Sequence, residues 1–279
     1  MFWLVEDDKQ LELFKNYVRK EAFVEIIPQN NLEHPAESGI CAVYIRPLDA
    51  TKGFILTNAH SETLNVGIDA IKCVLDTLDM VYVRDKKSFL HYLITQNLFD
   101  ITLTSPTYIP EPTKTHNYFY NKYPNKKNIN RIIPIVKHYE YCENIFNDLK
   151  EKIHEPINDF YNTKATVVFN AVERSGIRID REEFKSHFYD ERSEYIYTQY
   201  NFKTLTTRPS NKFNGINYAA LNKDNGCRKS FIPRNNKFIE LDIGAYHPTL
   251  LGLLVGYDFG DHDIHKSFAK MYGVDYQKS

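Results

Sequence analysis

Hydrophobic positions in the N-terminal part of the chain fall into short runs with two different spacings. Residues 22–27 and 41–45 are runs rich in β-branched and aromatic side chains, and a proline closes each of them. Residues 53–57 and 80–83 have the same character, whereas apolar residues recur at helical spacing over 68–78. The pattern predicts strands and a helix in alternation, which is typical of an α/β domain.

The pattern changes after this part of the chain. Residues 105–134 are rich in Pro, Asn, Lys and Tyr without a sustained period, which predicts a long loop or an interdomain crossing. Its interleaved basic and aromatic residues would suit contact with nucleic acid, and a tyrosine-rich solvated loop explains them equally well. Helical spacing then returns over 135–153 and 157–174, and Gly176 is expected to end the second helix.

A further helix start is expected at Asp180. Glu183 follows three residues later, as in a capping box, so Asp180 is predicted to be the N-cap residue.

Composition limits the class of protein. The chain has 279 residues, 42% of them hydrophobic and 25% charged, which is ordinary for a globular protein with a core. It contains no apolar run long enough to cross a membrane and does not begin like a signal peptide, so a cytoplasmic protein without membrane contact is expected. Four widely spaced cysteines predict reduced thiols rather than a cysteine zinc site.

Charge is unevenly distributed, although the net charge is only −1. From Lys203 to Lys237 there are eight basic residues and a single acidic one, Asp224. Carboxylates follow from Glu240 to Asp263 without an intervening Lys or Arg. A basic strip leading into an acidic segment suits phosphate chemistry with metal ions, and an uneven solvated surface is the simpler alternative.

The same region carries several short motifs in a fixed order. They are Thr206-Thr207-Arg208-Pro209-Ser210, Gly215-Ile216-Asn217, Gly226-Cys227-Arg228-Lys229-Ser230-Phe231, an apolar predicted strand Phe238-Ile239-Glu240-Leu241 ending at Asp242, and Asp263-Ile264-His265-Lys266-Ser267-Phe268-Ala269. Each is weak alone, but the order and spacing together resemble the palm entrance, motif A and the DIHxxxA helix start of family A DNA polymerases. Residues 172–180, Val-Glu-Arg-Ser-Gly-Ile-Arg-Ile-Asp, are similar to the turn that precedes the thumb in this family.

The resemblance implies a role for each matching residue. Asp242 would be the catalytic carboxylate that holds two Mg²⁺ ions, assisted by the backbone carbonyl of Ile243, because hard oxygen ligands suit Mg²⁺. Primer-template DNA would be contacted by four residues: Arg208, Asn217, Arg228 and Lys229. His265 would contact the incoming dNTP, and a helix-start histidine bonded to backbone is the structural alternative. His247 stands where the family has a glutamate that excludes ribose, so Tyr246 or His247 would have to serve that purpose.

Two parts of the family pattern are reduced or missing. Between Asp180 and Thr206 there is room for about one helix where a long thumb is expected. No finger helix and no motif C follow Asp263, so the second catalytic carboxylate would come from a partner polypeptide or from a further C-terminal region. The chain alone is therefore not expected to polymerise DNA.

The N-terminal part stands where family A enzymes carry a 3′–5′ exonuclease domain. The resemblance implies that Glu25, Asp85 and Glu143 are remnants of its metal-binding carboxylates, with Phe23 in place of the first aspartate. This predicts an exonuclease-like domain without nuclease activity. A divergent metal site built from His34, His60, Glu62 and Glu25 is the alternative.

Together these expectations predict three segments. Residues 1–134 would form an α/β exonuclease-like domain of the RNase H-like class, 135–204 a helical connector with a reduced thumb, and 205–279 the α+β start of a polymerase palm. The predicted function is the N-terminal fragment or subunit of a DNA-directed DNA polymerase of phage type. A non-catalytic DNA-binding or scaffold relative is the alternative, and a stand-alone metal nuclease on residues 1–150 is a third.

Overall fold

The computed structural model describes most of the chain. The described residues are 3–18, 20–31, 33–95, 97–103, 128–188, 194–202, 209–212, 216–222, 224–241, 245–258 and 263–273. The chain divides into two compact units, Met1–Ile232 and Pro233–Ser279, each of which is described by itself. Most of the loop predicted over 105–134 and the predicted site residues Arg208, Asp242 and Ile243 lie outside the described residues.

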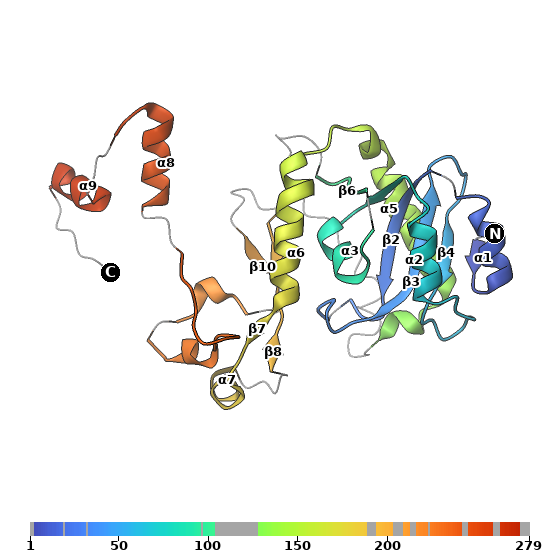
Figure 1. The fold of residues 1–279 in the computed structure, drawn as a ribbon, viewed down its shortest axis with the longest axis horizontal. Coiled ribbons are helices and arrows are strands. Elements are labelled where there is room, and N and C mark those ends of the chain that lie inside the picture. Colours follow the sequence, from blue (N-terminus) through green and yellow to red (C-terminus); the bar gives the residue numbers. More distant parts are fainter. Residues whose placement is uncertain are drawn as a thin grey trace. The chain divides into compact units, whose positions relative to one another are not determined.

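Among the described residues of the first unit, the main element is a six-stranded mixed sheet (Figure 1). Its strands are β1 (Trp3–Val5), β2 (Glu21–Pro28), β3 (Ile40–Pro47), β4 (Phe54–Thr57), β5 (Met80–Val83) and β6 (Leu98–Asp100), in the spatial order β1-β4-β3-β2-β5-β6. β2, β3 and β4 form an antiparallel meander, β5 and β6 continue the sheet parallel to β2, and β1 pairs in parallel with β4. The predicted α/β class and the four predicted strands are confirmed.

Both faces of the sheet are covered, which explains why its strands read as nearly continuous apolar runs. Four helices provide the cover: α1 (Asp8–Lys15), α2 (Ile68–Leu75), α3 (Lys86–Tyr92) and α5 (Ile135–Leu149). Along β2, Val24 faces the cluster that contains the buried residues of α1, α2 and α3, whereas Phe23 and Ile27 face α5. Figure 1 shows α2 and α5 on opposite sides of the strands.

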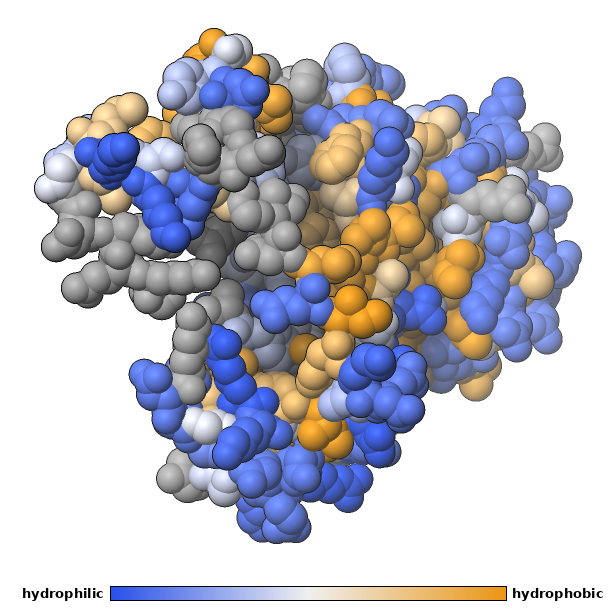
Figure 2. All heavy atoms as spheres, turned by 60° about the vertical axis from the view of Figure 1, so that its left-hand side comes forward, coloured by the Kyte–Doolittle hydropathy of each residue, from blue (hydrophilic) through white to orange (hydrophobic). Residues whose placement is uncertain are grey.

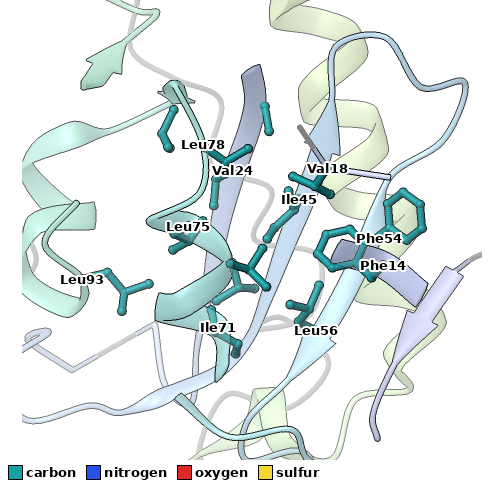
Figure 3. Packing of buried hydrophobic residues seen from close by; sticks show 14 of the residues in the cluster. Phe14, Val18, Val24, Ile45, Phe54, Leu56, Ile71, Leu75, Leu78 and Leu93 are labelled. Carbon is teal, nitrogen blue, oxygen red and sulfur yellow. The ribbon is translucent and has the colours of Figure 1, made fainter. Parts of the chain in front are cut away.

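The larger core lies between the sheet and α1, α2 and α3. Figure 3 shows side chains of this core, including Phe14 of α1 beside Phe54 of β4, whose ring centroids are 4.7 Å apart. Ile71 and Leu75 of α2 are one helical turn apart and no more than 1% exposed. Complete burial of each such side chain stabilises the fold by about 1.5–3 kcal/mol.

α5 belongs to the sheet and not to a separate connector. Its Ile135, Tyr139, Cys142, Ile145 and Phe146 pack in one cluster with sheet residues such as Phe23 and Tyr44. The expected boundary at residue 134 therefore does not divide compact units in the structure. Periodicity predicted this helix correctly but gave no information about where its apolar face packs.

The remainder of the first unit consists of short elements. These are η1 (Ile129–Arg131), η2 (Lys150–His154), the π-helical turn η3 (Phe160–Ala165), α6 (Thr166–Ser175), β7 (Ile177–Arg178), α7 (Arg181–Phe188), β8 (Tyr195–Ile196), β9 (Gln199–Asn201), β10 (Ser210–Lys212), η4 (Tyr218–Ala220) and η5 (Cys227–Ser230). The two predicted helices correspond to α5 with η2 and to η3 with α6.

The expected helix stop and helix start around residue 180 are both confirmed. Gly176 ends α6 at φ 62°, and a Cβ there would lie 2.8 Å from the ring of Tyr197. Asp180 accepts hydrogen bonds from the backbone N–H groups of Glu182 and Glu183, both at 3.1 Å, at the start of α7.

The second unit contains α8 (Tyr246–Val255) and α9 (Ile264–Tyr272). The predicted strand Phe238–Leu241 is not formed, and Phe238, Ile239 and Leu241 are 62–92% exposed. A strand requires a neighbouring strand for its backbone hydrogen bonds, and no described residue of this unit belongs to a strand. The apolar run therefore indicated that the segment favours strand structure, but it gave no information about which strand would pair with it.

Apolar side chains are also found on the surface. Figure 2 shows hydrophobic patches among hydrophilic side chains on the face that it turns forward. In the first unit, Val167, Val168 and Val172 of α6 are 46–59% exposed. Among the described helices, none is both long and apolar enough to span a bilayer.

Candidate functional site

The expected exonuclease remnants lie where β2, β5 and α5 meet. Glu25 is on β2, Asp85 is the second residue after β5, and Glu143 is on α5. Phe23 precedes Glu25 by two residues, and its ring packs against Phe146 of α5 at 5.7 Å between centroids. The fold thus packs the strand with Glu25 and the helix with Glu143 against each other.

Glu25 is bound by a cation from the protein itself. Its Oε1 is 2.5 Å from Nη2 of Arg84, the first residue after β5, and the Glu25 residue is 8% exposed. Burial raises the pKa of Glu25, and the guanidinium of Arg84 partly offsets this rise. Burial by itself would lower the pKa of the Arg84 guanidinium, but Glu25 together with Tyr141 and Asp85 outweighs this effect and raises that pKa. The pair is a largely buried salt bridge, with the Glu25 side chain 9% and the Arg84 side chain 22% exposed.

Glu143 links α5 to the sheet through hydrogen bonds. Its Oε1 accepts hydrogen bonds from the Tyr44 hydroxyl at 2.8 Å, from Nη1 of Arg46 at 3.1 Å and from the backbone N–H of Gly53 at 2.7 Å. Burial, followed by the neighbouring Glu143, raises the pKa of Tyr44. Gly53 has to be glycine because an added Cβ would lie 2.3 Å from the Tyr44 ring.

Asp85 has a local role at the start of α3. Its Oδ1 accepts from the Ser88 backbone N–H at 3.0 Å and its Oδ2 from the Ser88 hydroxyl at 2.8 Å, which caps the helix. Among the described residues, Glu25, Asp85 and Glu143 do not form a group that could share a metal ion.

Asp100, which the sequence analysis did not single out, lies at the end of β6. It is fully buried and accepts hydrogen bonds from the N–H groups of Lys86 and Thr102. The charges of Asp85 and Asp100 both raise the pKa of Glu25. An aspartate at the end of an apolar run is the signal that could have identified Asp100, because the same signal identified Asp242.

The alternative metal site is not assembled in the described residues. The Nε2 atom of His60 lies 2.8 Å from the carbonyl oxygen of Ile133, and its Nδ1 accepts from the Glu62 backbone N–H at 3.3 Å. Glu25 is paired with Arg84, and His34 lies elsewhere, beside His91. The four residues are therefore not brought together.

A different cluster forms around Glu173 of α6. This carboxylate is 1% exposed and binds Lys87 Nζ at 2.5 Å, His91 Nε2 at 2.7 Å and the Tyr200 backbone N–H at 2.6 Å. Burial opposes ionisation of Glu173, but the bonds from His91 and Lys87 prevail and lower its pKa. Single residues far apart in sequence gave no signal that could have predicted this cluster.

Three of the residues expected to bind DNA are described, and all three are exposed. Asn217 precedes η4, and Arg228 and Lys229 lie in η5. The guanidinium of Arg228 donates to the carbonyl of Leu221 at 3.2 Å, while the backbone of η5 packs against α7. Their positions allow contact with a phosphate backbone, and Arg208 lies outside the described residues.

In the second unit, the residues expected to contact a nucleotide are exposed as well. Tyr246 and His247 begin α8, with their ring centroids 5.4 Å apart in an edge-on arrangement. His265 is in the first turn of α9, and Asp263 caps this helix by accepting from the N–H groups of His265 and Lys266. The expected DIH helix start is confirmed, while Asp242 and Ile243 lie outside the described residues.

No known family model matches the chain, and no curated protein matches it.

Proposed function

We propose that the chain is the N-terminal fragment or subunit of a DNA-directed DNA polymerase related to family A. In this proposal an exonuclease-like domain of the RNase H-like class precedes the start of a polymerase palm. Asp242, with the carbonyl of Ile243, would ligate the two Mg²⁺ ions, and a partner polypeptide or a further C-terminal region would supply the finger helix and motif C. Primer-template DNA and a dNTP are the substrates.

The observation that carries the proposal is the sheet that precedes the polymerase-like motifs. An antiparallel meander, β2-β3-β4, is extended beside its first strand by two parallel strands, β5 and β6. We take this order and these directions as support for a domain of the RNase H-like class, to which the 3′–5′ exonuclease domains of polymerases belong. In this proposal Glu25 on β2 and Glu143 on α5 would stand for two carboxylates of such a domain.

Loss of nuclease activity follows from the groups around those carboxylates. Phe23 places a fully buried ring where a metal ligand is expected, and Arg84 supplies to Glu25 the positive charge that a metal ion would supply. We therefore predict that the full chain with Mg²⁺ or Mn²⁺ does not shorten a 3′-labelled single-stranded oligonucleotide. Metal-dependent degradation that Glu25→Gln abolishes would contradict this prediction.

The second unit supports a partner polypeptide. α8 is apolar on all sides, and Leu251, Leu253, Leu254 and Val255 are 60–75% exposed. A helix that is apolar around its circumference is normally buried in a larger core. The unpaired segment Phe238–Leu241 needs a neighbouring strand in the same way. We propose that the polypeptide with the finger helix and motif C covers both.

Primer extension tests the proposal. The chain is combined with the polypeptide encoded downstream of, or beside, its reading frame, and incorporation of dNTPs on a primer-template is measured with Mg²⁺. Asp242→Asn is expected to reduce extension by a factor of about 10³ or more, because the metal ions lose a shared ligand.

Glu151→Gln is the control, since Glu151 is an exposed carboxylate of the first unit, outside the segment assigned to the partner. It is expected to retain extension within about twofold of the unmodified chain, as for a surface substitution. Equal activity of the Asp242→Asn variant would refute the role of this residue. Salt-dependent DNA binding without extension by any partner would instead favour the non-catalytic relative.

A further inference from the structure

Two histidines in the first unit each have a buried ring nitrogen without a hydrogen-bond partner. The His91 side chain is 1% exposed, and its Nε2 lies 2.7 Å from Oε2 of Glu173. Because the carboxylate accepts at Nε2, neutral His91 has its proton there and a free lone pair at Nδ1. Both Nδ1 of His91 and Nε2 of His34 are buried without a hydrogen bond. A buried polar atom without a partner requires an explanation, and a bound ion or water is one.

We propose that His34 and His91 bind a divalent transition-metal ion such as Zn²⁺, with Glu173 holding His91 in position. One potential ligand atom from each of His34, His91 and Glu173 lies within 4.8 Å of the other two, the one such group in the described part of the chain. Imidazole nitrogen is a ligand that Zn²⁺ favours, and a carboxylate on the second ring nitrogen is the usual support of a metal-binding histidine.

The environment keeps His34 in the form that binds metals. Its ring is stacked on Tyr197 at 5.3 Å and meets His91 edge-on at 5.0 Å between centroids. Burial, and then the nearby His91, lowers the pKa of His34 to about 4, so the ring is neutral at neutral pH. In the structure, Nδ1 of His34 accepts a hydrogen bond from the exposed Ala36 N–H at 3.1 Å. A metal ion at Nε2 would move the His34 proton to Nδ1, and water would then hydrogen-bond to the Ala36 N–H in place of Nδ1.

Lys87 works against a bound cation and therefore provides an internal test. Its ammonium group binds the other oxygen of Glu173, at 2.5 Å, and is 4% exposed. A positive charge at this distance from the ion lowers its affinity, so removal of the charge should strengthen binding. Water or an anion would fill the coordination positions that the histidines leave free. The positive charge of Lys87 favours an anion there.

The experiment uses the full chain, freed of metal with a chelator and titrated with Zn²⁺ against a chromophoric competitor. One tightly bound ion per chain is expected. In the unmodified protein, the imidazole NMR signals of His34 and His91 should change on binding, while that of the exposed His154 should not. Lys87→Met should bind Zn²⁺ roughly tenfold more tightly.

Two variants complete the test. His34→Gln combined with His91→Gln should lose the tight ion, while His154→Gln should retain it, with folding followed by circular dichroism. Absence of tight binding by the unmodified chain would overturn the proposal, and so would unchanged His34 and His91 signals in the presence of bound Zn²⁺. The latter measurement decides the question even if the double variant does not fold. Neither result depends on polymerase activity.

Discussion

At the scale of single residues, Arg84 decides the chemistry of Glu25. In the proposed exonuclease-like domain, a carboxylate on the central strand β2 would be a nuclease ligand, but the partner of Glu25 is the guanidinium of Arg84, 2.5 Å away. Removal of one partner from a buried pair leaves the other charge without compensation, which costs more than the pair contributes when intact. Glu25 and Arg84 are therefore best tested together.

Arg84→Met is expected to destabilise the first unit by about 3–5 kcal/mol at neutral pH, because it leaves a buried carboxylate unpaired. The pKa of Glu25 is already raised by burial, and it should rise further without Arg84. The folded state then holds a proton more strongly than the unfolded state, so the loss should be smallest in acid and grow as the pH rises through the folded pKa. Urea unfolding at several pH values measures this.

The double variant Glu25→Gln with Arg84→Met is the control for this prediction. It buries no charge, so it should recover much of the lost stability and show no added pH dependence. A loss in Arg84→Met that does not vary with pH would mean that the Glu25 charge is not its cause.

At the scale of elements, α7 depends on its cap. Asp180 satisfies two N–H groups at the start of this helix, whose Phe184 is 1% exposed in a small cluster with Ile179 and Ile196. Asp180→Ala should lower the free energy of unfolding by about 1 kcal/mol, while Asp180→Asn, which preserves an acceptor, should cost only a few tenths. Denaturation midpoints and hydrogen exchange in α7 measure the difference; equal values for the two variants would contradict the cap.

α5 is linked by His138 to the segment that precedes it. Nε2 of His138 lies 2.9 Å from the carbonyl oxygen of Asn130, and burial lowers the pKa of His138 to about 4. Between about pH 6.5 and 4, His138 is therefore protonated in the unfolded state and neutral in the folded state. The stability from this group is present above pH 6.5 and is lost as the pH falls, by about 3 kcal/mol in total.

His138→Gln should remove that share of the loss of stability in acid, while His154→Gln, at an exposed position, should leave it unchanged. Thermal or urea unfolding at pH 7 and at pH 4.5 gives both values. An acid-induced loss in His138→Gln equal to that of the unmodified chain would show that other groups cause it.

At the scale of the whole molecule, we expect the exposed apolar helix α8 to contribute to association with the proposed partner and not to the stability of the chain. Leu254 is 75% exposed, so Leu254→Lys should change the stability of the chain by no more than about 0.5 kcal/mol. The same change should weaken association with the proposed partner and abolish primer extension, because it places a charge in the interface. Leu13→Lys is the matched control, since Leu13 is 58% exposed on α1 and should leave both properties unchanged. Sedimentation and primer extension provide the measurements.

Local patterns predicted most elements but not all of them. The strands β2 to β5 and the helices α2, α5 and α6 were expected because their apolar residues recur at the required period. The elements β1, α1, α3 and β6 were not, since β1 and β6 have only three residues each and the mostly polar α1 and α3 contain few apolar residues. The strand expected before Asp242 failed for the opposite reason, because its pattern was clear and its pairing partner was lacking.

The sequence by itself determined the α/β class, the caps at Asp180 and Asp263, and the stop at Gly176, because period, cap chemistry and glycine conformation act over a few neighbouring residues. The tertiary structure decided that α5 belongs to the sheet and that Glu25 is neutralised by Arg84. It also brought Glu173 into one cluster with Lys87 and His91, from which it is more than eighty residues away in the sequence. Such contacts arise from the way that distant elements pack, which no local pattern encodes.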